Sequence, residues 1–253
     1  MPARRPSASR ARVGASDRVR AEWGRRVEAE YRSAAITQHL TLWLIQIGAS
    51  PDLIAAGLAI VADELEHARL SHRVLVAAGG QGAPIGVRRD DLGLVRREGE
   101  PLEHDVARAA VEVFCLHETV AVPLFAGLRA GCRVPVARRA LDRVLRDEVR
   151  HRDFGWTLLG ALLDGPLGAA LGALVAAELP AMMRGVVAHY VAGGAAGAPD
   201  LDDDEVAWGL MPGPAYARIA ERTARKDYLP RFARHGLDAA AAWRAALAAT
   251  SPA

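Results

Sequence analysis

The 253-residue chain is poor in the residues that build disulfide networks and β-sheets. Its two cysteines do not form a spaced set, so neither a disulfide framework nor a cysteine-ligated zinc site is expected. Aromatic residues make up only 5% of the chain, and clusters of Val, Ile and Thr are sparse, which disfavours sheet. Alanine and leucine dominate instead, and the composition therefore predicts an all-α protein.

Charge and hydropathy argue against nucleic-acid and membrane partners. Six arginines and one acidic residue lie in the first 20 positions, so the rest of the chain is slightly acidic and lacks an overall basic field. We expect residues 1–16 to form a disordered basic arm. No secretory signal follows it, and no run of residues reads as long and apolar enough to span a bilayer. The sequence thus predicts a soluble, cytoplasmic protein.

Capping and breaking residues divide the chain into long helices. We expect Asp17 to cap the first helix, Pro51 to begin the second, and Pro123 to interrupt or kink the third. The expected helices cover residues 17–47, 51–78, 101–130, 135–163 and 167–191, with short helices after residue 205.

The connections between these helices predict their topology. The short connections after the first and third helices imply two antiparallel hairpins, and the Gly-, Arg- and Asp-rich segment 80–100 reads as a long crossover between them. We therefore predict a four-helix bundle over residues 17–163, with a helical extension, residues 164–253, packed on it.

The pattern that carries chemistry is Glu-x-x-His, which occurs in the second and the fourth expected helix. Residues three apart lie on one helix face, so each pair can bind a metal ion from one side. The first and third helices each place a Glu where the apolar stripe calls for a hydrophobic residue. Buried unpaired carboxylates are costly, so a cation is expected among them. The candidate ligands are Glu30, Glu64, His67, Glu118, Glu148 and His151.

The depth of these residues in the bundle supports a single site. Glu30 and Glu64 lie equally far from the first turn. Glu118 and Glu148 lie equally far from the second turn, so each hairpin brings its ligands level. The alternative interpretation is that all of them are ordinary surface charges on Arg- and Glu-rich helices.

Two segments resemble a known motif. Residues 63–67 (DELEH) and 147–151 (DEVRH) resemble the DE-x-x-H motifs of ferritin-like di-iron carboxylate proteins. The segments around Glu30 and Glu118 resemble the helix-one and helix-three segments of bacterial ferritin-like domain proteins of ill-defined function. The resemblance covers about residues 20–163. It implies a ferritin-like bundle with the six residues above as metal ligands.

The resemblance also implies a role for the acid that precedes each ligand Glu. Asp63 and Asp147 would each hydrogen-bond a ligand imidazole and fix its tautomer. A helix salt bridge with a nearby Arg is the alternative for either one. Lesser candidates are Tyr31, Phe114 and Cys115 as pocket residues, with core packing favoured for Tyr31 and Cys115, and Glu178 or His189 as an additional ligand.

Oxygen-rich ligands with two imidazoles suit iron or manganese better than zinc or copper. We expect two Fe ions, with a mixed Mn/Fe pair as the minor alternative, and O2 as co-substrate. The first hypothesis is an oxygenase or oxidase that hydroxylates, N-oxygenates or desaturates a small-molecule or carrier-bound substrate, served by an electron donor. A homodimer is compatible with it. The other hypotheses are a ferroxidase or iron-handling protein and a non-enzymatic helical interaction module.

Overall fold

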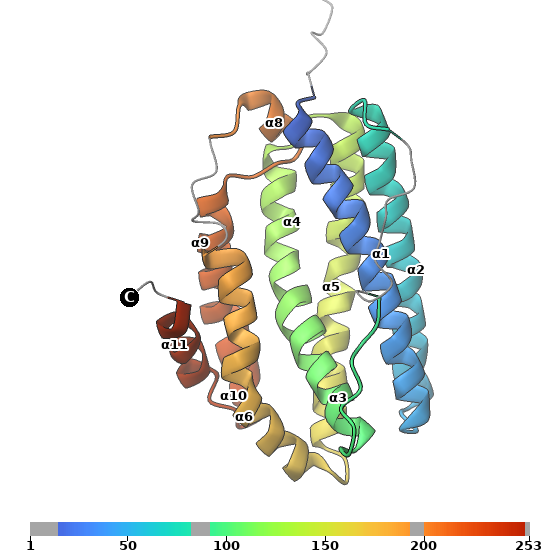
Figure 1. Ribbon diagram of the computed structural model, residues 1–253, viewed down its shortest axis with the longest axis vertical. Coiled ribbons are helices and arrows are strands. Elements are labelled where there is room, and N and C mark those ends of the chain that lie inside the picture. Colours follow the sequence, from blue (N-terminus) through green and yellow to red (C-terminus); the bar gives the residue numbers. More distant parts are fainter. Residues whose placement is uncertain (1–14, 82–91, 193–199, 251–253) are drawn as a thin grey trace, which may run out of the picture.

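The computed structural model describes residues 15–81, 92–192 and 200–250, and all regular structure within these ranges is helical (Figure 1). The prediction of an all-α helical bundle is confirmed. The expected disordered arm lies outside the described residues except for Ala15 and Ser16, and the middle of the expected crossover, residues 82–91, lies outside them as well.

The helices form a bundle with a second group along one side (Figure 1). The first hairpin is α1 and α2, and the second is the long helix α3–η2–α4 followed by α5. The later helices pack against η2, α4 and α5. The bounds are α1 Asp17–Gln46, α2 Pro51–Ala77, α3 Leu102–Ala109, η2 Ala110–Glu118, α4 Thr119–Gly131, α5 Pro135–Leu163, α6 Gly168–Val186, η3 Val187–Ala192, α8 Asp203–Ala207, α9 Gly213–Thr223, η4 Ala224–Tyr228, α10 Leu229–Arg234 and α11 Ala239–Thr250.

The start of α1 differs from the prediction by one residue. Ser16 and not Asp17 is the cap, because its hydroxyl accepts a hydrogen bond from the amide N of Val19 at 3.2 Å. Asp17 occupies the first turn instead, where a negative charge is favourable to the helix dipole. At the other end, Gly48 makes the turn to α2 with a φ of 71°, which a residue with a side chain rarely adopts.

The third helix departs from the prediction in a way that concerns the site. It runs without a break from Leu102 to Gly131, so of the two expectations for Pro123, an interruption or a kink, the interruption is wrong. Its nine residues Ala110–Glu118 instead form a π-helix, η2, in which each turn is wider than in an α-helix. Such segments are frequent at functional sites, and the candidate ligand Glu118 is the last residue of this one.

The π-helix packs backbone to backbone against α5. A Cβ atom on Gly155 of α5 would lie 2.4 Å from Cβ of Phe114 and 2.8 Å from its carbonyl carbon. The Phe114 ring is fully buried and packs edge-on against Phe154, with ring centroids 4.9 Å apart. The close approach at Gly155 lies one helical turn beyond His151, so it sets how far α5 stands from η2 next to the candidate site.

Two helices are long and apolar enough to cross a membrane by length and composition, Leu102–Gly131 and Gly168–Ala192. The expectation that no run could do so is therefore wrong on these criteria. However, 56% and 39% of their most apolar windows are buried inside the protein. Core helices of soluble proteins pass the same test, and the first of these two helices packs against α5, α6 and α9.

We expect Gly155→Ala to destabilise the fold, because the added methyl meets backbone that cannot rotate away. Overpacking of this kind costs about 1–3 kcal/mol, and chemical denaturation measures it. The matched control is Gly160→Ala in the same helix, whose nearest neighbour would be His235 Cε1 at 3.6 Å. That variant is expected to be neutral or slightly stabilising. Equal effects of the two substitutions would contradict the tight contact.

Candidate metal centre

The structure brings all six candidate ligands together in the core of the bundle. Each of the four long bundle helices supplies at least one of them, from α1, α2, η2 and α5. Their exposed fractions range from 0% to 8%, so none of them is a surface charge. The interpretation as ordinary surface charges is therefore wrong.

The six residues form two overlapping groups. Glu30, Glu64, His67 and Glu148 each offer a ligand atom, and these atoms lie within 4.8 Å of one another. The second group consists of Glu64, Glu118, Glu148 and His151, whose ligand atoms also lie within 4.8 Å of one another. Glu64 and Glu148 belong to both groups, which is the arrangement that two neighbouring ions sharing two carboxylates require.

The orientation of the two shared carboxylates fits this role. Oε2 of Glu64 lies 3.6 Å from Nδ1 of His67, and Oε1 lies 3.1 Å from Nδ1 of His151. Glu148 likewise directs Oε1 towards His67 at 3.9 Å and Oε2 towards His151 at 3.6 Å. Each carboxylate thus directs one oxygen to each half of the centre.

The donor atoms are spaced as ligands of a common ion. Donors about 2.1 Å from one ion lie roughly 3–4 Å apart, and the contacts of the two Nδ1 atoms with the four carboxylates span 3.1 to 4.0 Å. The described residues offer these atoms little else. Four of the buried side-chain atoms without a hydrogen-bond partner belong to the centre: Glu64 Oε2, His67 Nδ1, Glu148 Oε2 and His151 Nδ1.

The two aspartates hold the far nitrogens of the imidazoles across the hairpins. His67 Nε2 lies 3.2 Å from Oδ2 of Asp147, and His151 Nε2 lies 3.4 Å from Oδ2 of Asp63. Each His is therefore held by the Asp of the other hairpin. With the Nε2 proton donated to the carboxylate, Nδ1 is the nitrogen left to bind a cation.

Both aspartates also form ion pairs with arginines. Each Asp therefore both contacts a ligand imidazole and takes part in the expected salt bridge with a nearby Arg. Arg143 contacts Asp147 and, at 3.1 Å, Asp63. Arg150 reaches Asp63 at 2.7 Å and Asp147 at 2.9 Å. Burial would raise the pKa of Asp147, but Arg143 and His67 outweigh it and lower the pKa to about 2. This acid remains an anion that can orient His67.

The metal-free centre holds ionisable groups with strongly shifted pKa values. Burial, with the charges of Glu64 and Glu148, raises the pKa of Glu30 to about 8. Burial and the neighbouring Glu148 raise that of Glu118 well above its usual value. Burial would lower the pKa of His67, but Glu30 and Glu64 outweigh it and raise it to about 11. Four acids crowded in a dry core cannot all be ionised without compensating positive charge.

The lesser candidates lie elsewhere. Tyr31 is 46% exposed, so neither the expected core packing nor a pocket role holds for it. Phe114 and Cys115 are fully buried in packed apolar clusters and do not line the cleft described below. Glu178 forms ion pairs with Arg108 and Arg97 and belongs to neither ligand group. His189 is outside these groups as well and lines the cleft.

Two residues near the centre escaped the sequence analysis. Arg26 is 8% exposed and lies four residues before Glu30, hence on the same face of α1, a spacing that could have revealed it. Tyr190 lies in the π-helix η3, and its hydroxyl is 3.4 Å from Nδ1 of His117, the residue before Glu118. Burial, Glu118 and Glu148 raise the pKa of Tyr190. No spacing in the sequence links Tyr190 to the ligands.

Comparisons with known proteins identify no family. No family model matches the chain, and no solved structure matches it. A porphobilinogen deaminase from Rubrobacter xylanophilus is 37% identical over 90 residues, which are 35% of this chain and 27% of the deaminase. The chain thus aligns with about a quarter of that relative. The candidate ligands extend from Glu30 to His151, a longer stretch than the aligned one, so the match cannot contain the whole centre.

We expect Glu118→Gln to stabilise the metal-free protein. The substitution keeps the shape of the side chain and removes a buried acid that is repelled by Glu148 and Glu64. The gain should be on the order of 1 kcal/mol, measured as the free energy of unfolding after removal of metal by dialysis. Glu112→Gln, an exposed position in the same π-helix, is the control and should change little. A lower stability of the Glu118 variant would show that its charge is already compensated.

Proposed function

We propose that the chain is a ferritin-like di-iron carboxylate enzyme of the cytoplasm, which uses O2 to oxidise a small organic or carrier-bound substrate. The observation that supports it most is the pair of ligand groups that share Glu64 and Glu148. Within the described residues, four buried side-chain atoms of these groups have no hydrogen-bond partner. Four carboxyl groups crowded into the core oppose folding unless positive charge compensates them, and this favours a bound cation. The donor set of four carboxylates and two imidazoles favours iron, with a mixed Mn/Fe pair as the minor alternative.

The protein's own residues would bind the two ions, orient the ligand imidazoles and enclose the centre. Glu30 with His67 and Glu118 with His151 would hold one ion each, while Glu64 and Glu148 would hold both. Asp147 and Asp63 would keep the two imidazoles in position. When bound, the two ions would supply the reduction of O2 that is coupled to substrate oxidation, with any further electrons coming from an external donor. The buried surroundings would exclude bulk water from that chemistry.

Iron handling is the main alternative, since Fe(II) could itself be the substrate of the same centre. The cleft near the centre is lined by four arginines, Arg18, Arg25, Arg26 and Arg32, and by three acidic residues, Glu22, Glu28 and Asp200. This small excess of positive charge does not favour the entry of a cation. We therefore prefer an organic substrate. The deaminase activity of the partial relative is not extended to this chain, because the similarity spans 27% of that protein.

An anaerobic Fe(II) titration followed by exposure to O2 tests the proposal. We expect saturation at about two ions per chain, the number that a dinuclear bundle site holds, and oxidation of the bound iron. Uptake far beyond two would indicate storage. Binding that is unchanged in the double variant Glu118→Ala with His151→Ala would rule out the centre altogether.

The aspartate that orients His67 offers a second test. We expect Asp147→Asn to weaken metal affinity about 10- to 100-fold, because the amide cannot accept the Nε2 proton as strongly as a carboxylate. Asp142→Asn on the same helix is the matched control. Its side chain is exposed and pairs with Arg129, so affinity should be unchanged. Equal affinities in both variants would assign Asp147 to its arginine pairs alone.

A further inference from the structure

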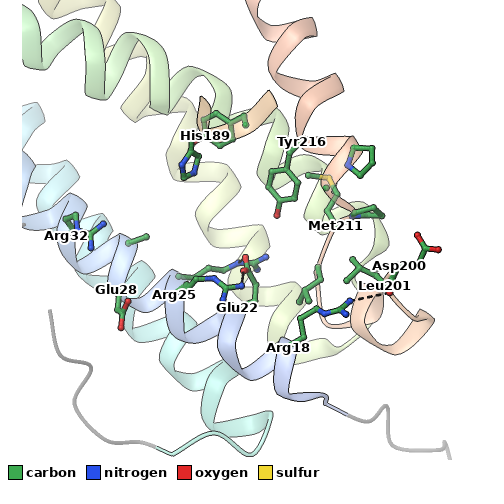
Figure 2. A pocket seen from close by; sticks show the side chains of 17 residues that line it. Arg18, Glu22, Arg25, Glu28, Arg32, His189, Asp200, Leu201, Met211 and Tyr216 are labelled. Carbon is green, nitrogen blue, oxygen red and sulfur yellow. Dashed lines mark hydrogen bonds and ion pairs between the residues drawn. The ribbon is translucent and has the colours of Figure 1, made fainter. Parts of the chain in front are cut away.

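A cleft of about 740 Å³ lies along the half of α1 that carries Glu30, although none of the six candidate ligands lines it. Its size is within the range of small-molecule sites. One wall is the N-terminal half of α1, and the other consists of η3, α9 and the segment 200–214 (Figure 2). Figure 2 shows Arg25 and Arg32 on the α1 side, facing His189 and Tyr216 across the opening. The apolar lining residues are Ala29, Leu201, Leu210, Met211, Pro212 and Pro214.

Arg26 is the exceptional residue of this cleft. Its guanidinium is buried, with Nη2 donating to the carbonyl of Gly209 at 2.9 Å and Nε donating to Glu22 at 3.2 Å. Nη1 makes no hydrogen bond within the described part of the chain. A buried donor left unsatisfied costs free energy, so a site of this kind favours an acceptor that completes it.

The surroundings of Arg26 favour an anion over a neutral acceptor. Glu22 is shared, because Arg25 also binds it at 2.6 Å, so one carboxylate serves two guanidinium groups. The Tyr216 phenol adjoins Arg26: burial raises the pKa of this phenol, and the charge of Arg26 and a hydrogen bond from its side chain oppose the rise. Planar guanidinium groups bind carboxylates and phosphates through paired hydrogen bonds.

The cleft also lies close to the centre. Arg26 and Glu30 are four residues apart on one face of α1, which separates them by about 6 Å along the helix. Tyr190 also lines the cleft, and its hydroxyl contacts His117, which precedes the candidate ligand Glu118. A small molecule bound at Arg26 would thus extend towards Glu30 and Tyr190.

We propose that this cleft binds the substrate, and that the substrate is a small organic anion with a carboxylate or phosphate group held by Arg26 and an apolar body directed towards Glu30. Only the statement that the bound anion is the molecule to be oxidised rests on the proposed function, since binding of the anion to Arg26 does not depend on metal. Arg26 is a binding residue in this proposal and has no part in the oxidation itself.

The test measures binding without activity. Full-length protein freed of metal by dialysis is titrated calorimetrically with 4-phenylbutyrate, phenyl phosphate and the uncharged 4-phenylbutan-1-ol. We expect at least one anion to bind about tenfold more tightly than the alcohol, the effect of a charge-assisted hydrogen bond. The better of the two anions identifies the group that the substrate carries. Binding of neither anion, or equal binding of the alcohol, would overturn the proposal.

Three variants locate the binding site. Arg26→Lys keeps the positive charge and removes the paired N–H donors of the guanidinium, so it should weaken anion binding about tenfold. Ala29→Phe fills the cleft from an exposed position on α1 and should abolish binding even if the Arg26 variant fails to fold. Arg69→Gln is the control of charge: its side chain is 73% exposed on α2, outside the cleft, and it should leave affinity unchanged. Anion affinity unaffected by Ala29→Phe would place the anion elsewhere.

The metal titration above is independent of these measurements. Two bound irons without anion binding would contradict the cleft and leave the proposed function standing. Anion binding without specific iron binding would contradict the proposed function and leave the cleft as an anion site.

Discussion

The burial of four carboxylates and two imidazoles at one level of a helical bundle is the constraint on which the rest of the structure depends. Uncompensated, such a cluster opposes folding through desolvation and mutual repulsion of the acids. The structure compensates part of it with the aspartates behind the imidazoles and with the arginines that pair with them. The atoms of the centre that still lack a hydrogen-bond partner within the described residues are the two Nδ1 atoms and one oxygen of each shared carboxylate, and these atoms could bind a cation.

Much of the centre could be predicted from sequence because it follows from regular geometry. Helices rise by a constant distance per residue, so residues equidistant from a turn lie level, and this places Glu30 beside Glu64 and Glu118 beside Glu148. The spacing of three residues likewise fixed which His accompanies each Glu. These inferences needed only the turns, which glycine and proline mark clearly in this chain.

The features that escaped prediction depend on contacts between distant segments. Pro123 was expected to interrupt or kink the third helix, yet the helix continues through it, and the π-helix lies upstream of it, packed against Gly155 from another helix. Tyr31 and Glu30 are neighbours in sequence, but only Glu30 faces the core, where its carboxylate lies within 4.8 Å of ligand atoms from α2 and α5. The spacing of Arg26 from Glu30 places it on the ligand face of α1, but its contact with the Gly209 carbonyl depends on a distant segment that the sequence does not link to it.

The crossed hydrogen bonds between aspartates and histidines have a consequence for how the proposed centre would exchange ions. Because Asp147 holds His67 and Asp63 holds His151, neither hairpin alone contains both a ligand His and the Asp that orients it. A fluctuation that separated the hairpins would disturb both halves together, whereas fraying of a single helix end would disturb neither. Loading and loss of the two ions would therefore be cooperative, governed by the docking of one hairpin on the other.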